Sequence, residues 1–98
     1  MKLSVKMRPL AQDELDDSVA YYEHAQVGLG LRLAAEVNRV IDIAAGAPKR
    51  YPIAYRDIRE APVPGFPYCV YYRVRGPFLI VLAVYHQSRD PAGWQGRP

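Results

Sequence analysis

The sequence has few of the residues that hold small proteins together covalently or through metals. Its 98 residues include one cysteine, Cys69, and two histidines, His24 and His86, that are far apart. A single thiol excludes an internal disulfide and agrees with a reducing compartment, so we expect the protein in the cytoplasm. No cluster has the spacing of metal ligands, and we expect neither a metal nor a cofactor. Stability must come from a packed core.

Long apolar segments and common catalytic motifs are also missing. The longest apolar run, Phe78–Tyr85, is far shorter than the ~20 residues that span a bilayer. Residues 1–6 are not followed by the apolar segment of a secretory signal, and we expect no membrane association. There are three serines and no threonine, which leaves little basis for a nucleophilic triad. The segment Gly28-Leu29-Gly30 lacks the third glycine and the preceding strand of a dinucleotide-binding loop.

Charge is divided unevenly along the chain. Residues 1–48 carry five basic and seven acidic side chains, whereas residues 49–98 carry eight basic and three acidic ones. The cationic second half favours an anionic partner, either nucleic acid or an acidic protein segment. We interpret the acidic cluster of the first half as a solvated helix start, because negative charge is favourable near a helix N-terminus. Its members are Asp13, Glu14, Asp16 and Asp17.

The length allows one domain, residues 1–98, and the pattern predicts its helices. Alternation over residues 2–8 predicts a short strand. A helix should begin near Pro9 and end before Gly28, and a second, clearly amphipathic helix should cover 29–44. Gly46 and Pro48 are typical of a helix end. The two helices should form a hairpin.

Three further strands are predicted after the helices. They cover residues 55–61, 68–75 and 78–86, and Gly76-Pro77 supplies the turn between the last two. The last strand is apolar at both its odd and its even positions, which is typical of a strand covered on both faces. The tail 87–98 has one tryptophan and no long periodic stretch. The chain is therefore an α+β domain of order β-α-α-β-β-β, with a helical hairpin on a small, mainly antiparallel sheet.

The predicted strands contain a basic and aromatic set that suits RNA cleavage without a metal. Histidine or tyrosine can move a proton, and arginine can stabilise the charged phosphate. Successive side chains of a strand point to opposite faces of the sheet. We therefore expect Tyr68, Val70, Tyr72 and Val74 to face the helices and the intervening residues to lie on the other face. We expect several candidates to converge on this face, which the helices leave uncovered; the alternative is solvated arginines and packing aromatics. The candidates are Arg56, Tyr71, Arg73, His86 and Arg89.

The order and spacing of several short motifs resemble the RelE/ParE superfamily of type II toxin–antitoxin toxins. These motifs are PxxYP at residues 48–52, Arg59, GFPYxxYYRV at 65–74 and VLAVYHxxRDPxxW at 81–94. The resemblance covers nearly the whole chain. It implies a small cytoplasmic toxin that a cognate antitoxin holds inactive by wrapping the helical hairpin and the sheet.

Candidate antitoxin contacts follow from this resemblance. They lie on the two predicted helices, and the alternative is that the same apolar stripe forms the core of the protein. The candidates are Val19, Tyr22, Glu23, Leu29, Leu33 and Val37.

The resemblance also implies two possible targets. RelE-like members cleave mRNA on the ribosome and often have an arginine where this chain has Cys69, which carries no permanent charge. ParE-like members inhibit DNA gyrase and are not enzymes. His86 and Arg89 match the family's HxxRD pattern, which in ribonuclease members contributes to catalysis. We favour a ParE-like gyrase inhibitor; the alternatives are a RelE-like endoribonuclease and a non-toxic antitoxin-binding module.

Overall fold

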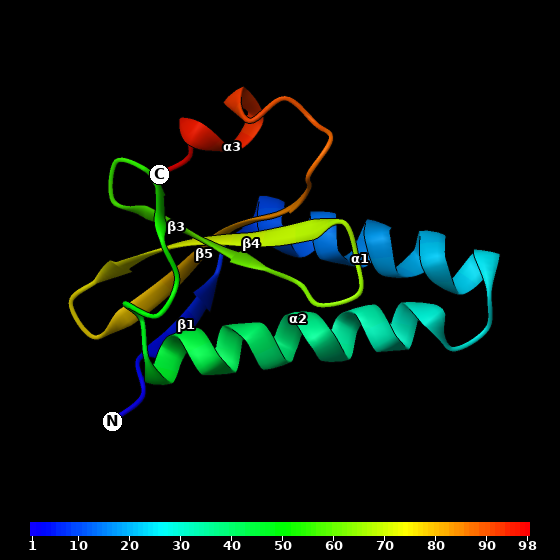
Figure 1. Ribbon diagram of the computed structural model, residues 1–98, viewed down its shortest axis with the longest axis horizontal. Coiled ribbons are helices and arrows are strands. Elements are labelled where there is room, and N and C mark those ends of the chain that lie inside the picture. Colours follow the sequence, from blue (N-terminus) through cyan, green and yellow to red (C-terminus); the bar gives the residue numbers. More distant parts are fainter.

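A helical hairpin covers one face of a five-stranded sheet in the computed structural model, which describes residues 1–98 (Figure 1). The predicted α+β class is confirmed, with two additions. The strand predicted over 55–61 is a short hairpin, β2–β3, and the tail contains a short helix, α3. The elements are β1 (Ser4–Met7), α1 (Pro9–Ala25), α2 (Leu29–Gly46), β2 (Ile53–Tyr55), β3 (Ile58–Pro62), β4 (Tyr68–Arg75), β5 (Phe78–His86) and α3 (Ala92–Gln95). None of the helices is long and apolar enough to cross a membrane.

The turn between α1 and α2 is held by a carboxylate from the end of α1. Glu23 accepts hydrogen bonds from the backbone N–H groups of Gly28 (2.7 Å), Gly30 (3.0 Å) and Leu31 (3.3 Å). The first N–H groups of a helix have no partner within the helix, and the residue before α2, Gly28, has no side chain to cap them. Glu23 supplies this N-terminal cap from α1. Gly28 has a φ of 90°, a left-handed conformation that glycine adopts without strain.

Replacing Glu23 with glutamine is expected to change the pH dependence of stability. The hydrogen bond from Gly28, with those from Leu31 and Gly30, lowers the pKa of the carboxyl below its ordinary value of 4.5. The ionised carboxylate therefore stabilises the fold at neutral pH, and this contribution is lost as the pH falls below about 4.5. Urea unfolding at pH 7 and pH 3 should show a larger stability difference between the two proteins at pH 7 than at pH 3. An equal difference at both values would contradict this role.

The sheet has the strand order β1-β5-β4-β3-β2, so β5 and β4 lie at its centre. β1 pairs with β5 in parallel, and the other neighbours pair antiparallel. The pairing of β4 with β5 shifts in its middle: Tyr71 lies opposite Ala83, but Tyr72 lies opposite Val81. Leu82 is therefore an extra residue, and this β-bulge exchanges the faces of the β5 residues that follow it.

Both faces of the sheet bury apolar side chains. The main core of 15 residues lies between the hairpin and the sheet and includes Leu33, Val37 and Tyr72, each 0% exposed. A second cluster of eight residues lies on the opposite face around Tyr71 and Trp94. This corrects the expectation of an uncovered face, because the C-terminal segment folds back over it. The prediction that β5 is covered on both faces is confirmed.

Candidate functional site

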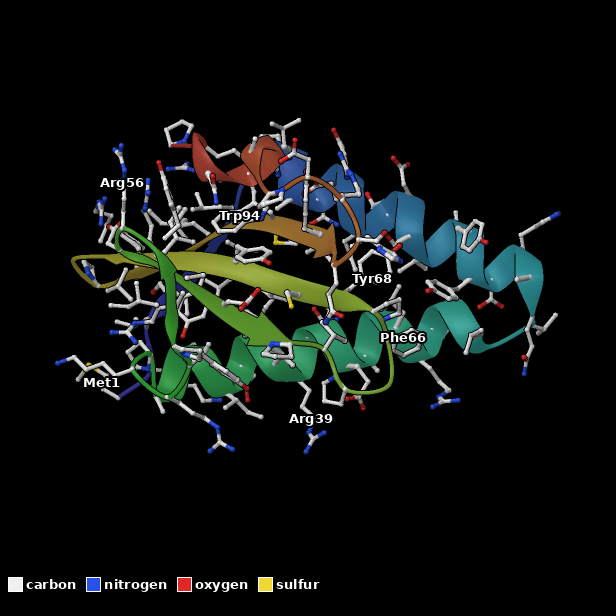
Figure 2. The ribbon with its side chains drawn as sticks, turned by 45° about the horizontal axis from the view of Figure 1, so that its top comes forward. Met1, Arg39, Arg56, Phe66, Tyr68 and Trp94 are labelled. Atoms are coloured by element: carbon white, nitrogen blue, oxygen red, sulfur yellow. The ribbon has the colours of Figure 1, made fainter.

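The C-terminal segment covers the face on which the catalytic candidates were expected. Trp94 lies over the sheet (Figure 2). Its indole stacks on the ring of Tyr71, with centroids 3.9 Å apart and planes at 16°. Tyr71 donates a hydrogen bond of 2.7 Å to Glu60, and its side chain is buried. The pKa of the Tyr71 hydroxyl is raised far above its ordinary value. Burial is the largest cause, and the hydrogen bond to the Glu60 carboxylate is the second. Tyr71 therefore holds its proton firmly and serves packing in this arrangement.

Arg73 lies on the same face and connects the β2–β3 turn with the end of the chain. Its guanidinium pairs with Asp57 at 3.2 Å and donates to the carbonyl oxygens of Arg97 (3.3 Å) and Pro98 (3.4 Å). The Arg73 side chain is 13% exposed. Its charge is thus largely committed to contacts within the protein.

His86 lies on the opposite face of the sheet from Tyr71 and Arg73. Its ring meets the Tyr68 ring edge to face at 5.1 Å, and Tyr68 packs against the main core beneath the hairpin. The Nδ1 atom accepts a hydrogen bond from the backbone N–H of Ser88 at 3.0 Å. The bulge at Leu82 is the physical reason, because it reverses the parity of β5 before His86 is reached.

The last two catalytic candidates are Arg56 and Arg89, and each contacts a different tyrosine ring. The guanidinium of Arg56, in the β2–β3 turn, lies 5.2 Å from the centroid of the Tyr55 ring. Arg89 lies 4.3 Å from the Tyr85 ring and 3.7 Å from a carboxylate oxygen of Glu14. Arg89 thus contacts a ring on the face that carries Tyr71 and Arg73, and Arg56 lies in the β2–β3 turn. His86 lies on the opposite face, so the expected convergence of all five candidates on one face is not found.

Glu14 does not belong to a solvated helix start, which corrects the interpretation of the acidic cluster. Its two carboxylate oxygens accept hydrogen bonds of 2.8 and 2.9 Å from the guanidinium of Arg97, and one also accepts from the backbone N–H of Val84. The side chains of Glu14 and Arg97 are each 15% exposed. The hydrogen bonds to Glu14 raise the pKa of Arg97 above its ordinary value. This pair fixes the end of the chain to α1.

The α1–α2 turn presents exposed apolar side chains that sequence periodicity did not select. Tyr21 is 70% exposed, Val27 91% and Leu31 69%. They lie outside the apolar stripes of the two helices, at positions expected to face solvent. A large apolar residue at such a position is itself a signal for a binding surface, and this signal could have identified all three. We call these three residues the hairpin patch.

The predicted antitoxin contacts divide by burial. Four of them, Val19, Tyr22, Glu23 and Leu29, are half-buried and border the hairpin patch. Leu33 and Val37 have no exposed surface and belong to the core. Only the first four have surface with which to contact a partner.

Comparison with known proteins agrees with this fold and with the sequence resemblance. A solved structure described as a chromosomal ParDE toxin–antitoxin system from P. aeruginosa superposes with a TM-score of 0.76 at 16% identity, covering 87% of this chain and 96% of that one. A search of curated proteins finds no significant match. The model of the ParE toxin family, described as the toxin of the parDE type II toxin–antitoxin system, matches residues 5–91. The chain belongs to the ParE toxin family of type II toxin–antitoxin systems.

Proposed function

We propose that this toxin arrests growth by inhibiting DNA gyrase in the cytoplasm and that it has no catalytic residues of its own. The observation that carries this choice is the separation of His86 from the other ribonuclease candidates. The sheet separates His86 from Tyr71 and Arg73, and Trp94 covers Tyr71. General acid–base chemistry requires its groups within hydrogen-bond reach of one substrate, and this arrangement does not provide it.

A cognate antitoxin that binds the hairpin patch is the second part of the proposal. Exposed apolar side chains at the tip of a helical hairpin suit an amphipathic segment that folds as it binds. Val19, Tyr22, Glu23 and Leu29 would form the border of that interface. Replacing Leu31 with glutamate should abolish co-purification with the antitoxin and leave toxicity intact, because Leu31 is exposed and makes no core contact. Retained co-purification would remove the patch from the interface.

The target can be tested by controlled induction in a bacterium that lacks the antitoxin. DNA and protein synthesis are followed separately by pulse labelling, with co-expressed antitoxin as the control. Gyrase inhibition predicts an early loss of DNA synthesis and a DNA-damage response before translation falls. Immediate loss of translation with intact DNA synthesis would instead mean a ribosome-dependent mRNA endoribonuclease. Normal growth together with a stable antitoxin complex would mean a non-toxic binding module.

His86 separates the first two outcomes at the level of one residue. It matches the HxxRD pattern, which is the specific observation that favours the ribonuclease alternative. Under gyrase inhibition, replacing His86 with alanine should leave toxicity unchanged in the same assay. A folded variant that still binds antitoxin and has lost toxicity would support RNA cleavage, with Arg56, Tyr71, Arg73 and Arg89 as the residues to examine next.

A further inference from the structure

A second surface lies at the end of the molecule opposite the hairpin patch. It is a groove of about 290 Å³ where the chain leaves α2 and meets strands β2 to β4. The α1–α2 turn and the β4–β5 turn lie at opposite ends of the long axis (Figure 1), so the groove and the hairpin patch are far apart. A partner on the hairpin patch would leave this groove accessible.

The groove is lined by three cations and one carboxylate. Lys49 lies just after α2, Arg59 is on β3 and Arg75 ends β4, and the single acidic residue is Asp57. Arg75 and Arg73 both pair with Asp57, and the hydrogen bond from Arg75 is the main cause of its lowered pKa. Asp57 thus remains ionised and orients the two arginines, while the groove keeps an excess of positive charge.

The remaining cations are available to a ligand. Lys49 is exposed and makes no ion pair or hydrogen bond through its side chain. Arg59 donates from Nη1 to the carbonyl oxygen of Tyr51 at 2.7 Å, which fixes the guanidinium and leaves its other donors. Two further exposed arginines, Arg50 and Arg56, lie next to groove residues in the chain. A concave surface with charge of one sign concentrates its field on an anion.

We propose that this groove binds the phosphate backbone of duplex DNA without reading sequence. Arginine forks held in position by the protein, together with an unpaired lysine, suit phosphate oxygens. No aromatic side chain lines the groove, so the stacking platform that single strands require is missing there. Four of the seven lining residues are charged, and three of these four are basic. Binding at this groove does not depend on gyrase being the target.

The test is fluorescence anisotropy of the full-length protein with a short labelled duplex over a range of salt concentrations. Three phosphate contacts predict a slope of log K against log salt of roughly −3. Replacing both Lys49 and Arg75 with alanine should weaken binding about tenfold at low salt and reduce the slope by about two. The control replaces Arg32 and Arg39, which lie on α2 outside the groove, and removes the same net charge. Its affinity should stay within about twofold of the original.

Any one of four outcomes would overturn the proposal. The first is an equal loss of affinity in both double variants, which would mean a general charge effect. The second is tighter binding to single-stranded RNA of equal length, and the third is tighter binding to an acidic peptide. Replacing Lys49 alone guards against misfolding, because its side chain has no partner within the protein. That variant should still lose several-fold in affinity, and unchanged affinity in it would also contradict the proposal.

Discussion

Replacing Gly30 with alanine is expected to destabilise the protein by about 3 kcal/mol or more, because backbone atoms occupy the space that the new methyl group needs. A Cβ atom on Gly30 would lie 2.3 Å from the carbonyl oxygen of Val19 and 2.8 Å from the Cβ of Glu23. Neither atom is the end of a flexible side chain. The two helices would have to separate at their turn, where Glu23 also caps α2.

Gly46 provides the matched control for this variant. It lies in the same helix, at its end, and a Cβ there would meet only the side chain of Lys2 at 3.9 Å. Its replacement with alanine should be neutral or stabilising by up to about 1 kcal/mol, because alanine favours helix. Urea unfolding of both variants measures the difference. If the two variants were equally stable, the close approach of α1 and α2 at Gly30 would be refuted.

Replacing Glu14 with alanine should cost about 2 to 3 kcal/mol, since it leaves the largely buried Arg97 without its partner. The Val84 N–H also loses an acceptor, and Arg89 loses its ion pair. The change should loosen the C-terminal segment in particular, because Glu14 joins α1 to the end of the chain. Hydrogen exchange should therefore increase most in residues 87–98.

A double-mutant cycle separates the pair from its surroundings. Replacing Arg97 with methionine keeps much of the side-chain volume and removes the charge, so the double variant should be more stable than the sum of the single changes indicates. Thermal unfolding of the four proteins gives the coupling. Additive effects would mean that Glu14 acts through Val84 and Arg89 and that the ion pair with Arg97 contributes little.

The helices and the central strands could be predicted because each has a hydrophobic pattern within its own segment of the sequence. Helical periodicity with Pro9 and Gly46 placed α1 and α2, and the alternation around Tyr72 placed β4 with the correct face toward the hairpin. The double-sided apolar pattern of residues 78–86 correctly predicted that β5 lies at the centre of the sheet. These features follow from burial, which imposes a period on the chain.

Features that depend on distant residues were not predictable in this way. The bulge at Leu82 has no local marker, and it moved His86 to the other face of the sheet. The tail has no period, yet Trp94 is buried because Tyr71 and Tyr85 provide a surface for it. Glu14 looked like one of four solvent-exposed acids until Arg97, 83 residues later, was placed beside it. The separation of His86 from Tyr71 follows from the bulge, and the burial of Tyr71 follows from the packing of Trp94.

The parallel pairing of β1 with β5 also orders the events of biosynthesis. Ser4 lies opposite Phe78, so the N-terminal strand has no partner strand until β5 has been made. The α1–α2 hairpin, by contrast, is made of contacts between nearby residues and can form early in translation. A nascent toxin therefore displays its hairpin before it has a sheet. An antitoxin that recognises the hairpin can meet the chain while it is still being made, before a complete toxin exists.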